Sequence, residues 1–304
     1  MNKLYMMVGL PGSGKSTYAK ELSIKENAIV YASDNLRGEL FENEDIQNRN
    51  NELFTELHKR IKQDLSEGKN VIYDATNISY KRRKAFLEEI KKFNTYKICC
   101  LKATPYDKCL EQNENRGRFV PEHIIKKMYL NFDIPAYFEG WDEIQIHYTD
   151  NTNGNWNELF ARLDKIDQDN PNHTFPIGIH CKSCATWVCS DSIQNHIPLD
   201  ENILKAAMLH DIGKEFTKQF KNYKGEVTDI AHYYHHENIS AYDALFYLRG
   251  IECDSILDIC QLIRYHMQPF FINTEKAKQK FINLVGQEFY DRLMILHEAD
   301  KKAK

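Results

Sequence analysis

The sequence predicts an α/β domain built on a parallel sheet, followed by an all-α domain. In the first half of the 304-residue chain, short apolar runs alternate with segments of helical periodicity, the pattern of strands joined by helices. A polar, turn-rich stretch follows at residues 150–155. Beyond it helical patterns dominate, and nine of the twelve histidines lie after residue 172. We therefore expect one domain at residues 1–150 and a second at residues 151–304.

The first predicted strand, at residues 4–8, runs into a glycine-rich turn. Gly-Leu-Pro-Gly-Ser-Gly-Lys-Ser-Thr occupies residues 9–17, and a helical pattern begins at Tyr18. Glycines let backbone N–H groups close around phosphates, and the helix N-terminus adds a positive dipole end. A lysine and a serine in this motif supply a point charge and a ligand for Mg²⁺. We expect a nucleoside triphosphate to bind here, in contact with Gly12, Ser13, Gly14, Lys15, Ser16 and Thr17.

Carboxylates follow two of the later strands. Strands are predicted at residues 28–31, 70–73, 96–101 and 143–146, with helices at residues 46–65, 79–93 and from 122 onward. Asp34 follows the first of these strands in Ser-Asp-Asn-Leu-Arg, and Asp74 follows the next in Asp-Ala-Thr-Asn. Since parallel strands end at one edge of the sheet, either carboxylate could orient an attacking hydroxyl or a metal-bound water. An aspartate before a helix is also a common N-cap, and this alternative stays open for both.

Two basic segments in this half could meet phosphates. Arg116-Gly-Arg118-Phe-Val-Pro precedes a predicted helix and is typical of a lid, because the planar guanidinium pairs with two phosphate oxygens. Lys81-Arg-Arg-Lys84 begins another predicted helix and could contact a nucleic-acid strand. For both segments the alternative is a solvated charged turn or helix end.

Taken together, these motifs resemble the 5'-hydroxyl polynucleotide kinases, the end-healing kinases of phages and bacteria, over about residues 1–148. The resemblance implies ATP and Mg²⁺ as cofactors, held through Lys15 and Ser16. It also implies that Asp34 is the general base on the 5'-hydroxyl and that Arg37 contacts the acceptor phosphate. Related kinases act on small molecules and on toxin targets, so the resemblance leaves more than one class of acceptor open.

The same resemblance assigns residues around the nucleotide. Asp74 matches the acidic residue after the third strand, and Arg116 matches the lid arginine. The family's lid often carries Arg-Asn where this chain has Gln112-Asn113. That departure could weaken the grip on the γ-phosphate, or Arg118 could replace the missing charge.

The second half is organised around His210-Asp211-Ile-Gly-Lys214. Adjacent histidine and aspartate side chains can both reach one metal where a helix ends, one giving nitrogen and the other oxygen. Helices are predicted at residues 178–190, 200–211, 236–249, 253–267 and 284–302. These helices or their ends carry four further candidate ligands, each of which alone would more often be an ordinary polar residue: His180, His236, His266 and Asp300.

As a set, these residues resemble the HD phosphohydrolase superfamily in its two-metal form, over about residues 172–302. The resemblance implies hydrolysis of a phosphoester by a metal-activated water, with Mn²⁺, Fe²⁺, Co²⁺ or Ni²⁺ as candidate ions. It implies one metal held by His180, His210, Asp211 and Asp300, and a second held by His236 and His266 with Asp211 bridging.

Two neighbouring residues leave alternatives open. His235 competes with His236 as a ligand, and Glu237 after His236 favours the latter. Lys214 could hold a phosphate oxygen or could be a solvated lysine stabilised by the end of a helix.

Composition limits the remaining classes. The net charge of -4 gives no global sign of nucleic-acid binding, so such a site must be local. No apolar run is long enough to cross a membrane and no signal-peptide pattern is present, so we expect a cytoplasmic protein. Cys181-x-x-Cys184 lacks a second pair for zinc, and reduced thiols are the default expectation, with structural zinc as the alternative.

A kinase and a hydrolase acting on the same atom would be futile, whereas on opposite ends of a broken strand they are complementary. We therefore expect a bifunctional end-healing enzyme that phosphorylates 5'-hydroxyl ends and removes a 3'-phosphate or 2',3'-cyclic phosphate. Its expected partners are nucleic-acid ends, of RNA rather than DNA, and an RNA ligase could act afterwards. One alternative is a small-molecule kinase joined to a nucleotide phosphohydrolase. Another is a non-catalytic, nucleic-acid-sensing regulatory protein.

Overall fold

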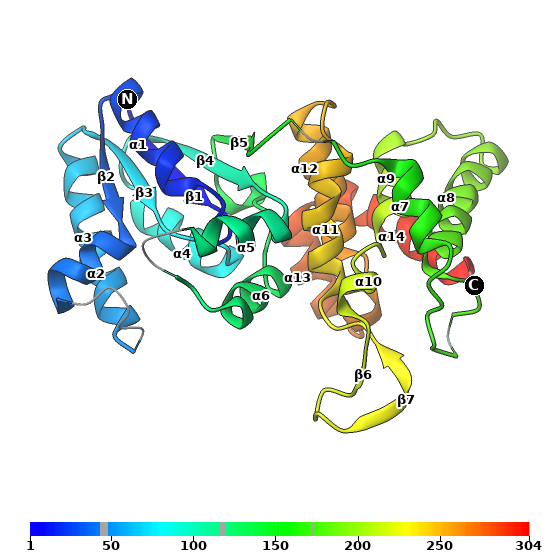
Figure 1. Cartoon of the computed structure of the whole chain (residues 1–304). Coiled ribbons are helices and arrows are strands. Elements are labelled where there is room, and N and C mark those ends of the chain that lie inside the picture. The colour runs from blue at the N-terminus through cyan, green and yellow to red at the C-terminus, as the bar shows by residue number, and fades with distance from the viewer. Residues whose placement is uncertain (43–47, 116–118, 152, 172, 304) are drawn as a thin grey trace. The chain divides into compact units, whose positions relative to one another are not determined.

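The computed structural model describes the chain except for residues 43–47, 116–118, 152, 172 and 304 (Figure 1). The chain forms two compact units, Met1–Tyr129 with Pro135–Asn151 and Leu130–Ile134 with Thr152–Lys304. The short segment 130–134 therefore belongs to the second unit. The predicted single boundary near residue 150 does not include this segment. Among the described residues, no helix has both the length and the apolar character that a bilayer span requires.

A five-stranded parallel sheet forms the centre of the first unit. Its strand order is β2-β3-β1-β4-β5. β1 therefore lies between β3 and β4, where the strand order reverses, and such switch points bind ligands at the carboxyl ends of the strands. The strands are β1 (Asn2–Val8), β2 (Ala28–Ala32), β3 (Asn70–Asp74), β4 (Thr95–Ala103) and β5 (Glu143–Tyr148).

The central strand is an apolar run because both of its faces are covered. Residues 4–8 of β1 are all buried, as expected for a strand inside a parallel sheet. The predicted alternation of strands and helices is confirmed, and the structure adds α2, α5 and η1, which the sequence pattern did not predict. The helices of this unit are α1 (Lys15–Glu26), α2 (Ser33–Phe41), α3 (Asn50–Ser66), α4 (Tyr80–Ile90), α5 (Tyr106–Glu114), α6 (Glu122–Leu130) and the 3₁₀ turn η1 (Tyr137–Glu139).

The second unit is helical, as predicted, and its helices pack through their apolar faces. The segment 130–134 is part of this packing: the Phe132 ring meets the Tyr242 ring edge-on at 4.7 Å, and Gln261 donates to the Ile134 carbonyl at 3.0 Å. The helices are α7 (Trp156–Leu163), α8 (Ile177–Gln194), α9 (Glu201–Leu209), α10 (Lys214–Thr217), α11 (His236–Tyr247), α12 (Cys253–Tyr265), η2 (Gln268–Phe271), α13 (Glu275–Val285) and α14 (Gln287–Lys302).

Several elements of this unit were not predicted, among them the short helices α10 and η2. A β-hairpin, β6 (Gln219–Lys221) and β7 (Val227–His232), lies between α10 and α11. Its strands are short and mostly exposed, so they lack the apolar alternation that marks a half-buried strand. Helix α13 was also missed, and of its residues only Phe281 is fully buried.

Candidate active sites

The glycine-rich turn wraps around the N-terminus of α1. Gly12 and Gly14 have φ angles of +79° and +82°, a region that glycine adopts without strain. A Cβ on Gly12 would lie 2.2 Å from the Cys109 carbonyl oxygen, so a larger residue has no room there. Ser13 is buried, and the Thr104 hydroxyl donates to its carbonyl at 3.0 Å. The backbone is therefore fixed locally before any ligand binds.

The two side chains expected to meet phosphates and Mg²⁺ differ in exposure. Lys15 is buried and donates from Nζ to the Leu10 carbonyl at 2.7 Å, across the mouth of the turn. Ser16 and Thr17, in the first turn of α1, are exposed. Lys102 of β4 was missed by the sequence analysis. Its Cε would lie 3.6 Å from a Cβ on Gly14, which brings a second lysine stem to the turn.

Asp34 and Asp74 lie at the carboxyl ends of neighbouring strands, as expected. Asp74 ends β3, pairs in register with Ala32 of β2 and is buried. Asp34 lies in the first turn of α2 and pairs with Arg37 at 3.1 Å. The Arg37 side chain is buried and also donates to Asn50 Oδ1 at 2.8 Å. In this structure the guanidinium expected to meet an acceptor phosphate is thus held against Asp34 and Asn50.

The sequence suggested that all four basic residues at 81–84 could contact a nucleic-acid strand. The structure shows that they differ in exposure, because Arg83 is buried while Lys81 and Arg82 are exposed. Arg83 is completely buried and makes a bidentate pair with Glu139, at 2.7 and 2.6 Å. It also donates to the Asn77 carbonyl at 3.0 Å, and Asn77 donates to the Met7 carbonyl at 2.9 Å. Arg83 therefore anchors the loop after β3 and is not available to a nucleic acid.

Arg116 and Arg118 lie outside the described residues. The residues on either side of 116–118 are described, and hydrogen bonds of the Asn113 side chain link the two sides. Its side chain donates to the Val120 carbonyl at 2.8 Å and accepts from the Val120 amide at 3.1 Å. Asn113, the second residue of the Gln112-Asn113 pair, thus joins α5 to Val120, which lies just before α6.

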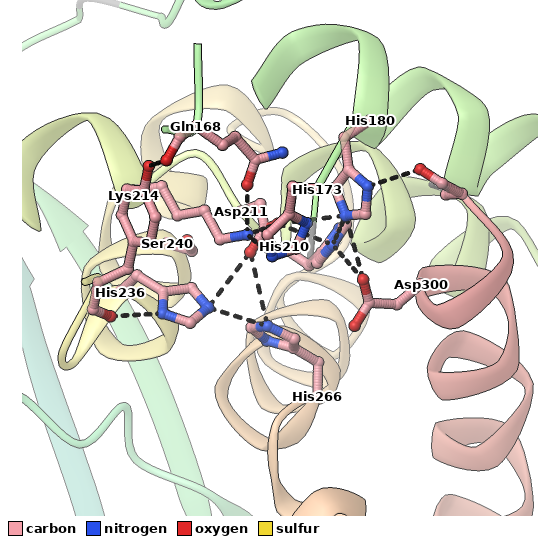
Figure 2. Close-up of polar contacts among 12 residues, drawn as sticks. Gln168, His173, His180, His210, Asp211, Lys214, His236, Ser240, His266 and Asp300 are labelled. Carbon is pink, nitrogen blue, oxygen red and sulfur yellow. Dashed lines mark hydrogen bonds and ion pairs between the residues drawn. The ribbon is translucent and has the colours of Figure 1, made fainter. Parts of the chain in front are cut away.

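In the second unit, six side chains from five segments converge (Figure 2). All six are buried, and they form two groups that share Asp211. The first group is His180, His210, Asp211 and Asp300, and the second is Asp211, His236 and His266. These are the residues that the sequence predicts as metal ligands. His235 lies outside both groups and is exposed at the N-cap of α11.

The imidazoles are oriented so that one nitrogen of each ring faces the centre. In every case Nδ1 lies within 2.7–2.8 Å of a backbone carbonyl, those of Ala303, Ala207, Tyr233 and Ile263, so Nδ1 carries the proton. The Nε2 lone pair is left for the centre. This arrangement is the usual support of a metal-bound histidine.

Asp211 lies between the two groups. Its Oδ2 is 3.2 Å from His180 Nε2, and its Oδ1 is 3.2 Å from His236 Nε2. Both oxygens are buried, and the Lys214 ammonium lies 2.6 Å from Oδ2. The two buried oxygens each face a different histidine pair, and this arrangement fits a carboxylate that bridges two cations.

The electrostatics of the cluster also favour cations. Burial opposes ionisation of Asp211, yet Lys214 and His210 hold its pKa well below the usual range. Burial alone would lower the pKa of His210, but Asp211 raises it well above its usual value. Burial and the neighbouring histidines lower the pKa of His266 to about 3. The acidic pair thus attracts positive charge, while His266 stays a neutral donor, the form that binds metal.

Three supporting residues were missed or left undecided. Lys214 is buried rather than solvated, with Nζ 2.6 Å from Asp211 Oδ2 and 2.8 Å from Gln168 Oε1. His173 lies beside it, 3.4 Å from the ammonium, and burial followed by Lys214 lowers the pKa of His173 to about 4. These contacts follow from tertiary packing and leave no pattern in the sequence.

Packing holds the ligand-bearing helices in place. Arg292 of α14 pairs with Asp200, the N-cap of α9, at 2.7 Å and with Asp258 of α12 at 2.6 Å. A Cβ on Gly213 would lie 2.5 Å from the His236 carbonyl, and the Gly213 amide donates to Ser240 Oγ at 2.8 Å. The glycine after His-Asp therefore allows α11 to approach closely enough to bring His236 to Asp211.

Comparison with known proteins agrees with this division. Residues 4–135 match the model of the AAA domain, and residues 180–303 match the model of the HD domain. The chain joins a P-loop kinase domain to an HD domain. The fold class expected from the sequence is therefore confirmed, and the HD cluster is of the kind found in metal-dependent phosphohydrolases.

The individual proteins that resemble this chain share only low sequence identity with it. The L-seryl-tRNA(Sec) kinase of Methanococcus maripaludis is 27% identical over 254 residues, which cover 75% of this chain and 93% of that protein. A chain of the Pnkp1/Rnl/Hen1 RNA repair complex is 24% identical with a TM-score of 0.39, and the match covers 42% of each chain. A gluconokinase from Sinorhizobium meliloti is 14% identical with a TM-score of 0.36, covering 49% of this chain and 83% of that one. At these TM-scores the structural likenesses carry no functional argument.

Proposed function

We propose that this chain heals the two ends of a broken RNA strand, phosphorylating the 5'-hydroxyl and removing a 3'-phosphate or 2',3'-cyclic phosphate. The observation that carries the proposal is the presence, in one chain, of a phosphate loop for kinase chemistry and a complete ligand cluster for phosphoester hydrolysis. Opposite reactions on one atom would cancel. On opposite ends of a strand they produce 5'-phosphate and 3'-hydroxyl ends, which an RNA ligase can join.

In the kinase half, Asp34 accepts the proton of the attacking hydroxyl while the γ-phosphate moves from ATP to that oxygen. The partial exposure of Asp34, at 39%, is what a base that meets an external substrate needs. Lys15, the Gly12–Gly14 backbone and Ser16 hold the ATP phosphates and Mg²⁺. Arg37 positions Asp34 through their ion pair, and an acceptor phosphate would compete with Asp34 for that guanidinium. Arg116 and Arg118 supply the lid charges.

In the HD half, His180, His210, Asp211 and Asp300 would hold one divalent metal, and His236, His266 and Asp211 would hold the second. Bound metals supply Lewis-acid polarisation of the phosphate and a water nucleophile at neutral pH. The chain's own contribution is to aim the four Nε2 atoms, to place the Lys214 ammonium beside Asp211 on the wall of the cavity, and to bury the ligands. Each hydrolysis forms a bond between phosphorus and the oxygen of water and breaks the bond between phosphorus and a ribose oxygen, which leaves as a hydroxyl. A 3'-phosphate needs one such step, whereas a 2',3'-cyclic phosphate needs two, the first opening the ring and the second releasing inorganic phosphate.

The seryl-tRNA kinase relative favours a second candidate for the kinase half. Its acceptor, as its name states, is a serine carried on tRNA. The kinase domain here could instead phosphorylate a hydroxyl of a group attached to RNA. Both candidates share an RNA-borne hydroxyl and differ in its position.

Labelled ATP distinguishes these candidates. The protein is incubated with Mg²⁺ and with 5'-hydroxyl RNA, 5'-hydroxyl DNA, seryl-tRNA or gluconate. End healing predicts label on the RNA 5' end. Label on the seryl group would establish the second candidate, and label on gluconate alone would establish a small-molecule kinase. In parallel, 3'-phosphorylated RNA and free nucleotides are incubated with Mn²⁺, and hydrolysis of free nucleotides alone would contradict the repair assignment.

A further inference from the structure

The metal cluster forms one side of a cavity that is larger than a phosphate requires. The cavity has a volume of about 500 Å³, within the usual range for small-molecule sites. Its inner wall carries Asp211, Lys214, His236, His266 and Asp300. A phosphate over the cluster would occupy only this charged end, so the group esterified to it must lie in the remainder of the cavity.

Aromatic residues also line this cavity. Phe270 and Phe271 of η2 line it from one side, directly after the ligand His266. Phe271 is 67% exposed and Phe270 is 45% exposed, although phenylalanine normally contributes to folding by being buried. The Phe270 ring rests edge-on against His297 at 4.5 Å, which fixes its plane.

The segment between β7 and α11 lines the cavity as well. The Tyr234 ring lies parallel to the His232 ring, with centroids 5.6 Å apart and an angle of 5° between the planes. His232 is in turn fixed by a 3.0 Å hydrogen bond with Thr228. Tyr233 is committed elsewhere, because its hydroxyl donates to the Gln168 carbonyl and Lys214 lies over its ring. Flat, pre-oriented rings from two segments thus lie in the same cavity as the cation-binding cluster.

We propose that Phe271, with Phe270 and Tyr234, forms a stacking platform for the nucleobase of the nucleotide whose phosphate lies at the metal cluster. This inference rests on the proposed hydrolysis of a nucleic-acid end and names the part of the substrate that the site selects. Every base has a flat π-face, so a platform of rings binds any base with little sequence preference. A lipid chain would not use the charged end of the cavity, and a bare sugar phosphate would leave the rings without a planar partner.

Binding measurements on the full-length, metal-loaded protein test this platform without requiring turnover. Adenosine 3'-phosphate carries the base, and glycerol 2-phosphate is a base-free ester of a secondary alcohol. We expect wild-type protein to bind the adenosine ligand at least about tenfold more tightly, given the usual strength of base–aromatic stacking. Phe271→Ala should lose most of that advantage and leave the Kd for glycerol 2-phosphate unchanged, whereas Phe271→Tyr should retain it.

Tyr223→Ala provides the matched control. Tyr223 is an aromatic residue of the same unit, 80% exposed at the turn between β6 and β7 and absent from the cavity lining. This variant should bind both ligands like wild type. Equal affinities of wild-type protein for the two ligands, or equal losses in Phe271→Ala and Tyr223→Ala, would overturn the platform.

Kinetics separate this inference from the proposed reaction. With a 3'-phosphorylated oligonucleotide, Phe271→Ala should raise KM by about tenfold with little change in kcat, since stacking acts on binding. A loss confined to kcat would contradict the platform while leaving hydrolysis established. A base preference in binding without phosphate release from any 3' end would support the platform and contradict the proposed hydrolysis.

Discussion

In the first unit, the expected phosphate loop consists of nine consecutive residues, Gly9–Thr17. The six candidate metal ligands of the second unit come from five separate segments. The loop works mainly through its backbone, which two left-handed glycines shape. The cluster works through side chains, which hydrogen bonds to four backbone carbonyls orient. A local site of the first kind is set by its own sequence. A distributed site depends on how several helices pack, so residues far from the chemistry control it.

The largest expected effect is on the distributed site. Asp211→Ala should lose both metals and reduce 3'-end hydrolysis by more than about 10²-fold, because loss of merely supporting residues around a metal already costs 10- to 100-fold. His266→Ala should lose chiefly the second metal. Metal analysis of the purified variants, together with phosphate release, measures both effects.

Kinase activity of Asp211→Ala should match wild type when Mg²⁺ and ATP are supplied. If Asp211→Ala retained two metals per chain, the bridging role assigned to this carboxylate would be wrong.

The corresponding change in the local site is Lys15→Ala. Removal of one pre-organised charge from a phosphoryl-transfer site costs roughly 10²–10³-fold in rate. We expect transfer from ATP to fall by at least this factor while hydrolysis at the HD cluster is unchanged, as measured with separate 5'- and 3'-labelled substrates. Loss of both activities in a folded Lys15→Ala protein would contradict the separation of the two sites.

Arg83→Ala tests how much the local site depends on distant packing. This change leaves Glu139 buried without its charge partner, which typically costs about 3–5 kcal/mol. The free energy of unfolding of the first unit should fall by that amount, as followed by denaturant titration. Arg82, the exposed neighbour, provides the control, since Arg82→Ala should stay within about 0.5 kcal/mol of wild type. Equal effects of the two substitutions would show that the buried pair does not support the fold.

Ligand removal should affect the two units separately. A ligand at 100 times its Kd stabilises the folded state by about 2.7 kcal/mol. Chelation of transition metals should therefore lower the melting temperature of the HD unit alone, and withdrawal of Mg²⁺ and ATP should lower that of the kinase unit alone. Calorimetry with each ligand in turn measures this. A single transition that responds equally to both ligands would indicate that the units do not unfold independently.

The contrast between the sites also explains what the sequence could predict. The phosphate loop has a contiguous motif between a strand and a helix, and His210-Asp211 with the spaced histidines has a recognisable order. The Arg83–Glu139 pair joins residues 56 positions apart, and Arg292 reaches Asp200 across 92 positions. Neither pair belongs to a periodic pattern, so a single sequence gave no reason to separate Arg83 from the solvated basic residues around it.

The same reasoning applies to Lys214 and the hairpin. Whether a lysine at the end of a helix is solvated or buried depends on what packs over it, here Gln168, His173 and Tyr233. The hairpin β6–β7 is largely exposed, so burial imposed no alternation on its residues. Recognisable motifs thus predicted the glycine-rich loop and the set of residues that cluster in the second unit. The partners of Arg83 and Lys214 depend on tertiary contacts that leave no motif, so they were not predicted.

The central claim, that two independent sites process opposite ends of one strand, is tested most directly with a single RNA oligonucleotide. This RNA carries a 5'-hydroxyl and a 2',3'-cyclic phosphate, and it is incubated with ATP, Mg²⁺ and Mn²⁺ before both ends are analysed by mass spectrometry. The account predicts a product with a 5'-phosphate and a 3'-hydroxyl from wild-type protein. It predicts only the 3' change from Lys15→Ala and only the 5' change from Asp211→Ala. An unchanged RNA at both ends, under conditions where the protein consumes ATP or hydrolyses free nucleotides, would contradict it.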